Sequence, residues 1–189
     1  MKSVAFLAAL LAAAVIAQPV RAAEGTLRAG VFDPPRAAPD FSLTGSDGNE
    51  LKLSRYHGKV VLLGFGYSHC AAVCPTTLAT LAQARRKLGA TGKDLQVVYV
   101  TVDPERDGPV QLHDFLATFD PSFIGGTGTP RALAAVRQGY GITSTKVANG
   151  FDHSSFVYLI DREGRIRALM PYGHGADDYA HDAAILLRE

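Results

Sequence analysis

The sequence has almost no excess of charge of either sign. Its 19 lysine and arginine residues face 18 aspartate and glutamate residues, which leaves a formal net charge of +1. A surface that binds nucleic acid needs a basic patch or a basic run, and the interspersed charges of this chain provide neither. The composition therefore argues against a nucleic-acid partner.

Long apolar runs are equally scarce, because no second one follows the run from Val4 to Ala17. Lys2 precedes this run and small residues follow it, so residues 1–23 are typical of a secretory signal peptide. The run is shorter than the ~20 residues of a membrane-spanning helix, which favours cleavage over anchoring. We therefore expect an exported, periplasmic protein without a membrane anchor. The alternative is an uncleaved anchor that holds the protein facing the periplasm.

Cysteine is rare as well, since Cys70 and Cys74 are the two cysteines of the whole chain. Export usually favours structural disulfides. A bond between residues so close in sequence removes little entropy from the unfolded chain, so it would stabilise the fold poorly. A domain of this length can bury an adequate core without such a bond. The spacing of the pair therefore indicates a chemical role for the two thiols instead of a structural disulfide.

Residues 24–39 are rich in proline, glycine and alanine and show no period, so we expect a flexible lead-in segment there. Residues 40–189 then form one domain of ordinary size. It begins with a predicted β-hairpin, because residues 40–44 and 50–54 alternate apolar and polar side chains around a turn.

Continuous apolar runs at residues 60–65 and 95–102 predict two buried strands with a helix between them. Helical spacing and a second strand–turn–strand pattern predict helices over 74–88, 110–119, 130–140 and 178–188 and strands over 156–160 and 165–170. This order predicts an α/β, thioredoxin-like fold, in which helices flank a central mixed β-sheet with an N-terminal β-hairpin.

The cysteine pair lies where the first buried strand ends and the next helix begins, with Cys74 at the helix start. Free backbone N–H groups at a helix start stabilise a thiolate, so we expect both thiols to be partly accessible and easily ionised. Three residues separate the cysteines, whereas thioredoxin-type redox centres have two. This longer loop can close into a disulfide between redox-active Cys70 and Cys74. It can also hold both sulfurs on one soft ion such as Cu(I).

A third copper ligand has to come from one of the six histidines. His153 has the best position, because it lies just before the strand predicted over 156–160. In a thioredoxin-like fold the loop before that strand faces the cysteine-bearing turn. Asp152 is a candidate to orient the imidazole from outside the ligand set. The alternative is an ordinary surface histidine in a loop.

Three motifs in order resemble the Sco family of copper chaperones. They are G-Y-S-H-C-x-x-x-C-P at 66–75, V-D-P-E-R-D at 102–107, and D-H-S at 152–154 followed by Y-L-I-D-x-x-G at 158–164. The resemblance implies that Cys70, Cys74 and His153 bind copper, as Cu(I) with Cu(II) as a second state. It also implies that Asp103 lies close to the site and supports the metal loop, the alternative being an ordinary cap or turn carboxylate.

The resemblance further implies a function in copper delivery to, or thiol maintenance of, the dinuclear copper centre in subunit II of cytochrome c oxidase. Another copper-accepting protein is the alternative partner. A rival function is a thiol–disulfide oxidoreductase that acts on partner cysteines without a metal, so enzymatic activity stays an open question. That rival requires Cys70 and Cys74 but not His153. In an oxidising compartment the empty thiols close to a disulfide, which a thiol reductase has to reopen.

Overall fold

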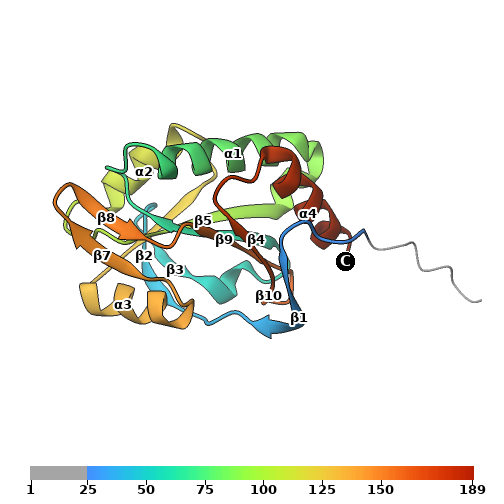
Figure 1. Cartoon of the computed structure of the whole chain (residues 1–189), viewed down its shortest axis with the longest axis horizontal. Coiled ribbons are helices and arrows are strands. Elements are labelled where there is room, and N and C mark those ends of the chain that lie inside the picture. The colour runs from blue at the N-terminus through green and yellow to red at the C-terminus, as the bar shows by residue number, and fades with distance from the viewer. Residues whose placement is uncertain (1–24) are drawn as a thin grey trace, which may run out of the picture.

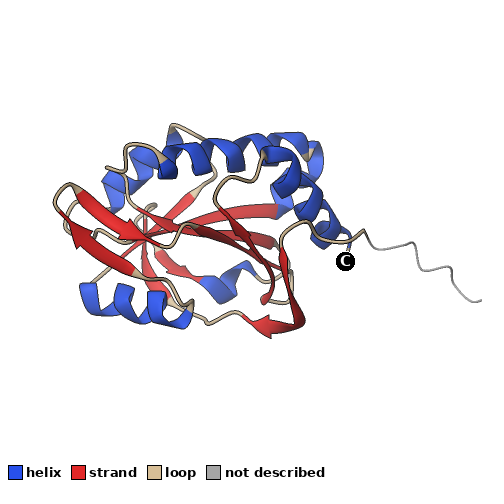
Figure 2. Ribbon diagram, in the orientation of Figure 1, coloured by secondary structure: helices blue, strands red, loops and turns tan. Residues whose placement is uncertain are grey.

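The computed structural model describes residues 25–189, and the signal peptide predicted over 1–23 lies outside this range. A layer of strands has helices on both faces, as Figures 1 and 2 show. The strands are β1 (Gly30–Ala37), β2 (Ser42–Gly45), β3 (Glu50–Lys52), β4 (Val60–Gly66), β5 (Leu95–Thr101), β6 (Ile124–Thr127), β7 (Ser144–Val147), β8 (Gly150–His153), β9 (Phe156–Ile160) and β10 (Arg165–Pro171). The helices are α1 (Val73–Lys87), α2 (Pro109–Ala117), α3 (Pro130–Gly139) and α4 (Ala176–Arg188), with short 3-10 turns η1 (Leu53–Tyr56) and η2 (Gly89–Asp94).

The principal sheet within the described residues has eight strands in the order β1-β10-β9-β4-β5-β6-β2-β3, and β7 pairs with β8 in a separate ribbon. Strand β4 lies inside the sheet, parallel to β5 and antiparallel to β9. Every residue of β4 is buried, as its continuous apolar run predicts. This mixed sheet with its flanking helices confirms the predicted thioredoxin-like α/β fold.

Helices α1, α2 and α4 lie on one face of the sheet and α3 lies on the other (Figure 1). Right-handed crossovers from β4 through α1 to β5, and from β5 through α2 to β6, put both helices on the same face. The carboxyl ends of β4 and β5 therefore meet at one edge of the sheet, where the cysteine-bearing loop begins. None of the helices within residues 25–189 has both the length and the apolar character needed to cross a bilayer.

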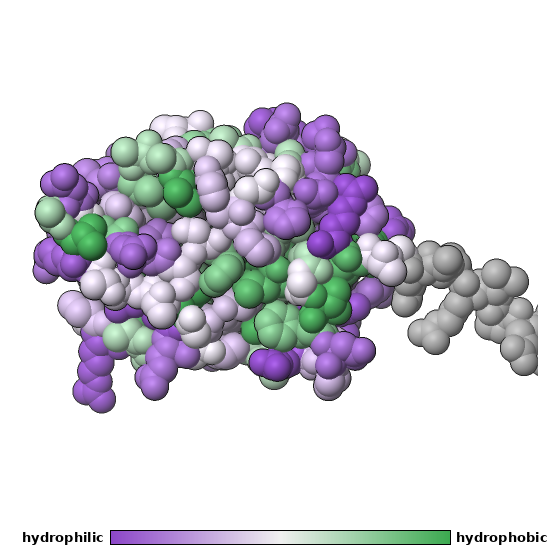
Figure 3. All heavy atoms as spheres, in the orientation of Figure 1, coloured by the Kyte–Doolittle hydropathy of each residue, from purple (hydrophilic) through white to green (hydrophobic). Residues whose placement is uncertain are grey.

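The predicted flexible lead-in is wrong for much of its length, because Gly30–Ala37 forms strand β1. β1 pairs antiparallel with β10, and its register shifts between Val31 and Arg36, where the prolines of this strand lie. An edge strand tolerates proline, since one side of its backbone needs no partner. Its residues are almost all exposed, so no alternating pattern marks it in the sequence. Apolar surface gathers over this part of the molecule in Figure 3.

The predicted hairpin is confirmed as β2 and β3, although it follows β1 instead of beginning the fold. The sequence patterns do not predict β6 or the ribbon of β7 and β8. β6 contains two glycines, which interrupt its apolar run. β7 is mostly exposed, so burial imposes no alternation on it. The last residue of the ribbon is His153, the predicted third copper ligand.

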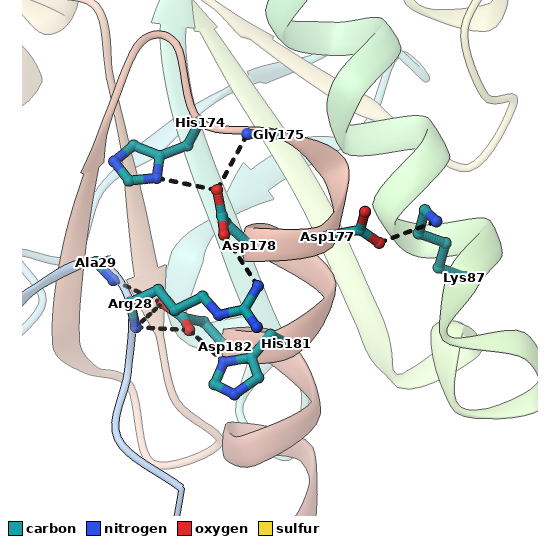
Figure 4. Close-up of polar contacts among 9 residues, drawn as sticks. All are labelled: Arg28, Ala29, Lys87, His174, Gly175, Asp177, Asp178, His181 and Asp182. Atoms are coloured by element: carbon teal, nitrogen blue, oxygen red, sulfur yellow. Dashed lines mark hydrogen bonds and ion pairs between the residues drawn. The ribbon is translucent and has the colours of Figure 1, made fainter.

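A buried carboxylate on α4 holds the segment that precedes β1. Asp182 is 0% exposed and accepts the backbone N–H groups of Arg28 at 2.8 Å and Ala29 at 2.9 Å. His181 Nδ1 lies 2.9 Å from the same carboxylate, and the Arg28 guanidinium pairs with Asp178 at 3.0 Å (Figure 4). These contacts fasten the start of the described chain to its last helix.

Replacing Asp182 with alanine should leave two backbone N–H groups without their acceptor. We expect the free energy of unfolding, measured with denaturant, to fall by about 1–3 kcal/mol. Asp177→Ala is the matched control, since that carboxylate is 79% exposed on the same helix and pairs with Lys87. An exposed ion pair contributes only ~0–1 kcal/mol. Equal stabilities of the two variants would contradict the anchoring role of Asp182.

Candidate metal centre

The loop between β4 and α1 carries Cys70, and Cys74 lies in the first turn of α1, both as free thiols. The backbone N–H of Cys74 donates to the Cys70 sulfur across 3.4 Å. Burial opposes ionisation of Cys70, but the hydrogen bonds from Cys74 and the backbone N–H groups of Ala72 and Val73 outweigh it. They hold the pKa of the Cys70 thiol below its ordinary value. The helix start therefore favours a thiolate at Cys70, as predicted.

Cys74 lies in the opposite kind of environment. The residue is 2% exposed and belongs to the core. Burial raises the pKa of the Cys74 thiol to about 12, and the neighbouring Tyr99 hydroxyl and Tyr67 backbone offset this increase only in part. The prediction that both thiols ionise easily is therefore wrong for Cys74, because its sulfur lies beneath the helix start, away from water.

His153 reaches the cysteines through the pairing of β9 with β4. Val157 of β9 lies opposite Gly64 of β4, so the chain just before β9 lies where β4 ends. There His153 Nε2 is 3.8 Å from Cys74 Sγ. His153 Nδ1 lies 2.9 Å from the Ser154 carbonyl oxygen, which fits an Nδ1–H donor and makes Nε2 the ring atom that faces the sulfur. The fold thus brings the imidazole against one of the two sulfurs.

The separation between sulfur and nitrogen suits a metal ion bound to both atoms. Bonds of about 2.3 Å to sulfur and about 2.0 Å to nitrogen, at trigonal or tetrahedral angles, put the two donors ~3.5–3.7 Å apart. The observed separation of 3.8 Å is close to that range. Within residues 25–189, no three His, Cys, Asp or Glu side chains already lie at metal-binding spacing. Cys70, in its partly exposed loop, therefore has to turn toward Cys74 and His153 before all three share an ion.

Tyr67 supports the ribbon that carries His153, a role that sequence reasoning missed. Its ring packs edge-on against Phe151 and His153, with ring centroids 5.8 and 6.0 Å apart. Its hydroxyl accepts the backbone N–H of Phe151 at 3.3 Å. The Arg106 guanidinium lies 5.8 Å from the same ring. Tyr67 stands in the first motif, but the motif alone does not show that its ring meets a ribbon far along the chain.

Asp107 fixes the first residues of the cysteine loop, and sequence reasoning missed this role as well. Its buried carboxylate accepts the Ser68 backbone N–H at 3.0 Å, the Ser68 hydroxyl at 2.5 Å and the Thr101 hydroxyl at 2.7 Å. These bonds join the loop after β4 to the end of β5. The only signal in the sequence was the position of Asp107 in the second motif.

The two predicted supporting carboxylates have different fates. Asp152 is exposed, and the Ser154 carbonyl occupies the place at His153 Nδ1 that Asp152 was predicted to fill. Successive strand residues point to opposite faces, which turns Asp152 away from its neighbour. The prediction for Asp152 is therefore wrong. Asp103 is buried and pairs with Arg106, which fits the turn carboxylate of the alternative interpretation.

Comparisons of the sequence and of the structure with known proteins lead to the same family. A sequence model of the SCO1/SenC family matches residues 32–188. The SCO2-like protein of Rickettsia felis is 34% identical over 134 residues, which span 67% of this chain and 65% of that relative. The structure of Bradyrhizobium japonicum ScoI with copper bound is 31% identical, with a TM-score of 0.74, over 79% of this chain and 99% of that one. The solution structure of apo Sco1 from Thermus thermophilus is 34% identical, with a TM-score of 0.73, over 88% and 98%.

Iodoacetamide near neutral pH should modify Cys70 well before Cys74. Cys70 is partly exposed and its thiol has a lowered pKa, whereas burial raises the pKa of Cys74 to about 12. Reaction at Cys70 should accelerate as pH rises, with a midpoint below that of an ordinary thiol. Fragment mass spectra of the labelled peptide locate the modification.

Two variants control for this labelling experiment. Cys74→Ser should react at the wild-type rate, and Cys70→Ser should react slowly. Equal labelling of both cysteines in the folded wild-type protein would refute the proposed difference in environment.

Proposed function

The chain belongs to the SCO1/SenC family, and from this premise we propose that it binds copper through Cys70, Cys74 and His153 and passes it to a partner protein. The observation that carries this proposal is the 3.8 Å approach of His153 Nε2 to Cys74 Sγ. Two thiolates are soft donors that suit Cu(I), and imidazole also binds copper, with Cu(II) as a second state. The copper-bound Bradyrhizobium relative supports the choice of metal.

Copper is the cargo of this centre, and the two thiols divide the work of capturing it. Cys70 ionises more readily and lies in the exposed loop, so it supplies the first ligand. Cys74 releases its thiol proton to solvent as its sulfur bonds to copper, because only the thiolate is a good ligand. His153 already directs Nε2 at the same sulfur, because the Ser154 carbonyl engages its Nδ1.

Release requires ligands that a partner can replace one at a time. Cys70 and His153 are both partly exposed, whereas Cys74 is buried. The partner's own sulfur and nitrogen donors therefore reach copper on the side of Cys70 and His153, and the bond to Cys74 breaks last. A low-coordinate, partly open site permits this exchange, whereas a closed four-ligand cage would retain the ion.

We propose the dinuclear copper centre in subunit II of cytochrome c oxidase as the acceptor, in the periplasm after export. The family membership supports this choice of acceptor, and the apolar run from Val4 to Ala17 supports export.

Thiol–disulfide exchange is a second candidate function, favoured by the contrast between the two thiols. The Cys70 thiolate attacks one sulfur of a partner disulfide, and the other partner sulfur leaves as a thiolate. Cys74 then loses its proton and attacks the mixed disulfide. The partner leaves as a dithiol, and Cys70 and Cys74 remain joined in a disulfide that a thiol reductase has to reduce. This sequence needs no imidazole.

Anaerobic copper titration of the reduced protein should give an equimolar complex with a thiolate-to-copper charge-transfer band for Cu(II). His153→Ala should lower the Cu(I) affinity at least about tenfold, ~1.4 kcal/mol, because one of three ligands is lost. Cys70→Ser and Cys74→Ser should each lower the Cu(I) affinity further than His153→Ala does. Competition with a chromophoric chelator measures these affinities.

His113→Ala is the matched control, since that imidazole is 58% exposed on α2 and pairs with Asp114. It should leave both the affinity and the spectrum unchanged. A His153→Ala protein with wild-type affinity and an unchanged spectrum would falsify the three-ligand centre.

Disulfide exchange with a peptide substrate, assayed without metal, separates the two candidate functions. We expect His153→Ala to reduce the peptide at the wild-type rate while its copper affinity falls, since the imidazole serves only the metal. A parallel loss of exchange in this variant would show that His153 takes part in thiol chemistry, against the copper proposal.

A further inference from the structure

Tyr99 of β5 is 1% exposed, yet its hydroxyl has no hydrogen-bond partner of normal geometry among residues 25–189. Two other buried tyrosines differ: the Tyr140 hydroxyl donates to the Pro39 carbonyl at 2.8 Å, and the Tyr158 hydroxyl donates to the Tyr140 carbonyl. Burying a hydroxyl without a partner costs free energy that a phenylalanine in the same place would avoid. The groups next to the Tyr99 hydroxyl therefore need to be identified, because one of them has to account for a tyrosine at this position.

Two glycines of β4 make room for the Tyr99 ring. Gly64 lies opposite Tyr99 in the parallel pairing of β4 with β5, and a Cβ there would come within 3.2 Å of the ring. Gly66 lies two residues further along the same face of β4. A Cβ at Gly66 would overlap the Tyr99 hydroxyl and come within 2.8 Å of Cys74 Sγ. The ring therefore runs along β4, and its hydroxyl and the Cys74 sulfur are neighbours on either side of the space above Gly66.

The same sulfur is the one that His153 approaches. Cys74, Tyr99 and His153 line one small cavity. His153 Nε2 lies 3.8 Å from the sulfur, and the phenol of Tyr99 approaches the same sulfur from β5. Cys74 is therefore flanked by a nitrogen that can share its metal and by a hydroxyl that can donate to it.

We propose that Tyr99 is a positioning residue of the copper centre, whose hydroxyl donates a hydrogen bond to the Cys74 sulfur when that sulfur is a copper-bound thiolate. This inference rests on the proposed function, because it concerns the same sulfur. A neutral thiol is a weak acceptor and a charged sulfur is a stronger one, so the bond strengthens when copper displaces the thiol proton. It also offsets part of the cost of burying a charged sulfur. Hydrogen bonding around a cysteine ligand tunes the copper–sulfur bond.

The test is Tyr99→Phe, which keeps the ring and removes only the hydroxyl, with Tyr140→Phe as the matched control. The reduced proteins are loaded anaerobically with Cu(II), and absorption spectra record the thiolate-to-copper charge-transfer band. Without its hydrogen bond the sulfur is richer in electrons, so the Tyr99→Phe band should move to lower energy. The Tyr140→Phe band should stay at the wild-type position. Thermal unfolding of the copper-free proteins should show Tyr99→Phe to be no less stable than the wild type.

Site-specific incorporation of 3-fluorotyrosine at position 99 supplies a second arm, which also decides the matter if Tyr99→Phe fails to fold. Its more acidic hydroxyl is a stronger donor, so the band should move to higher energy, opposite to the phenylalanine variant. Wild-type band positions in both variants overturn the role of Tyr99 and leave the copper proposal intact. A wild-type protein that shows no charge-transfer band at all overturns both.

Discussion

The antiparallel pairing of β9 with the central strand β4 is the constraint on which the whole centre depends. Cys74 and His153 are 79 positions apart in the chain, and this pairing brings their side chains within 3.8 Å. The ribbon of β7 and β8 ends where β9 begins, so the position of β9 also fixes the position of the imidazole. Without it, the cysteine loop would be a pair of thiols at a helix start, which is a redox couple and nothing more.

The sheet also gives the two thiols unequal environments. Cys70 lies in a loop where backbone N–H groups point at its sulfur, and Cys74 lies in the first turn of α1 against the fully buried strand β4. The first environment favours a reactive, exchangeable ligand, and the second favours one that is shielded from water. The proposed copper transfer requires both properties, because the ion has to be taken up and later released.

Residues next to the candidate donors stabilise the cysteine loop and the ribbon of β7 and β8. Neither of these segments belongs to the principal sheet. Tyr67 packs against the ribbon of His153, and Asp107 binds both the cysteine loop and the end of β5. The Asp107 carboxylate is held by hydrogen bonds inside the fold, and the Tyr67 ring is held by contacts with other rings. They pre-position His153 and the cysteine loop, and in the proposed copper centre the movement of Cys70 completes the site.

The amino-acid sequence by itself determined the buried strands, the helix at Cys74 and the choice of candidate metal donors. Continuous apolar runs, a proline after the cysteine and three ordered motifs are local patterns. Such patterns can be recognised in the sequence without knowledge of the tertiary structure. Strand β1 and the ribbon of β7 and β8 left no such pattern, since they are exposed and held mainly by their partners. Only the tertiary structure decided that Cys74 is buried, that a Ser154 carbonyl instead of Asp152 orients His153, and that Tyr99 reaches the sulfur across Gly66. Each of these depends on which strands pair, and pairing is a property of the whole sheet that no short stretch of sequence records.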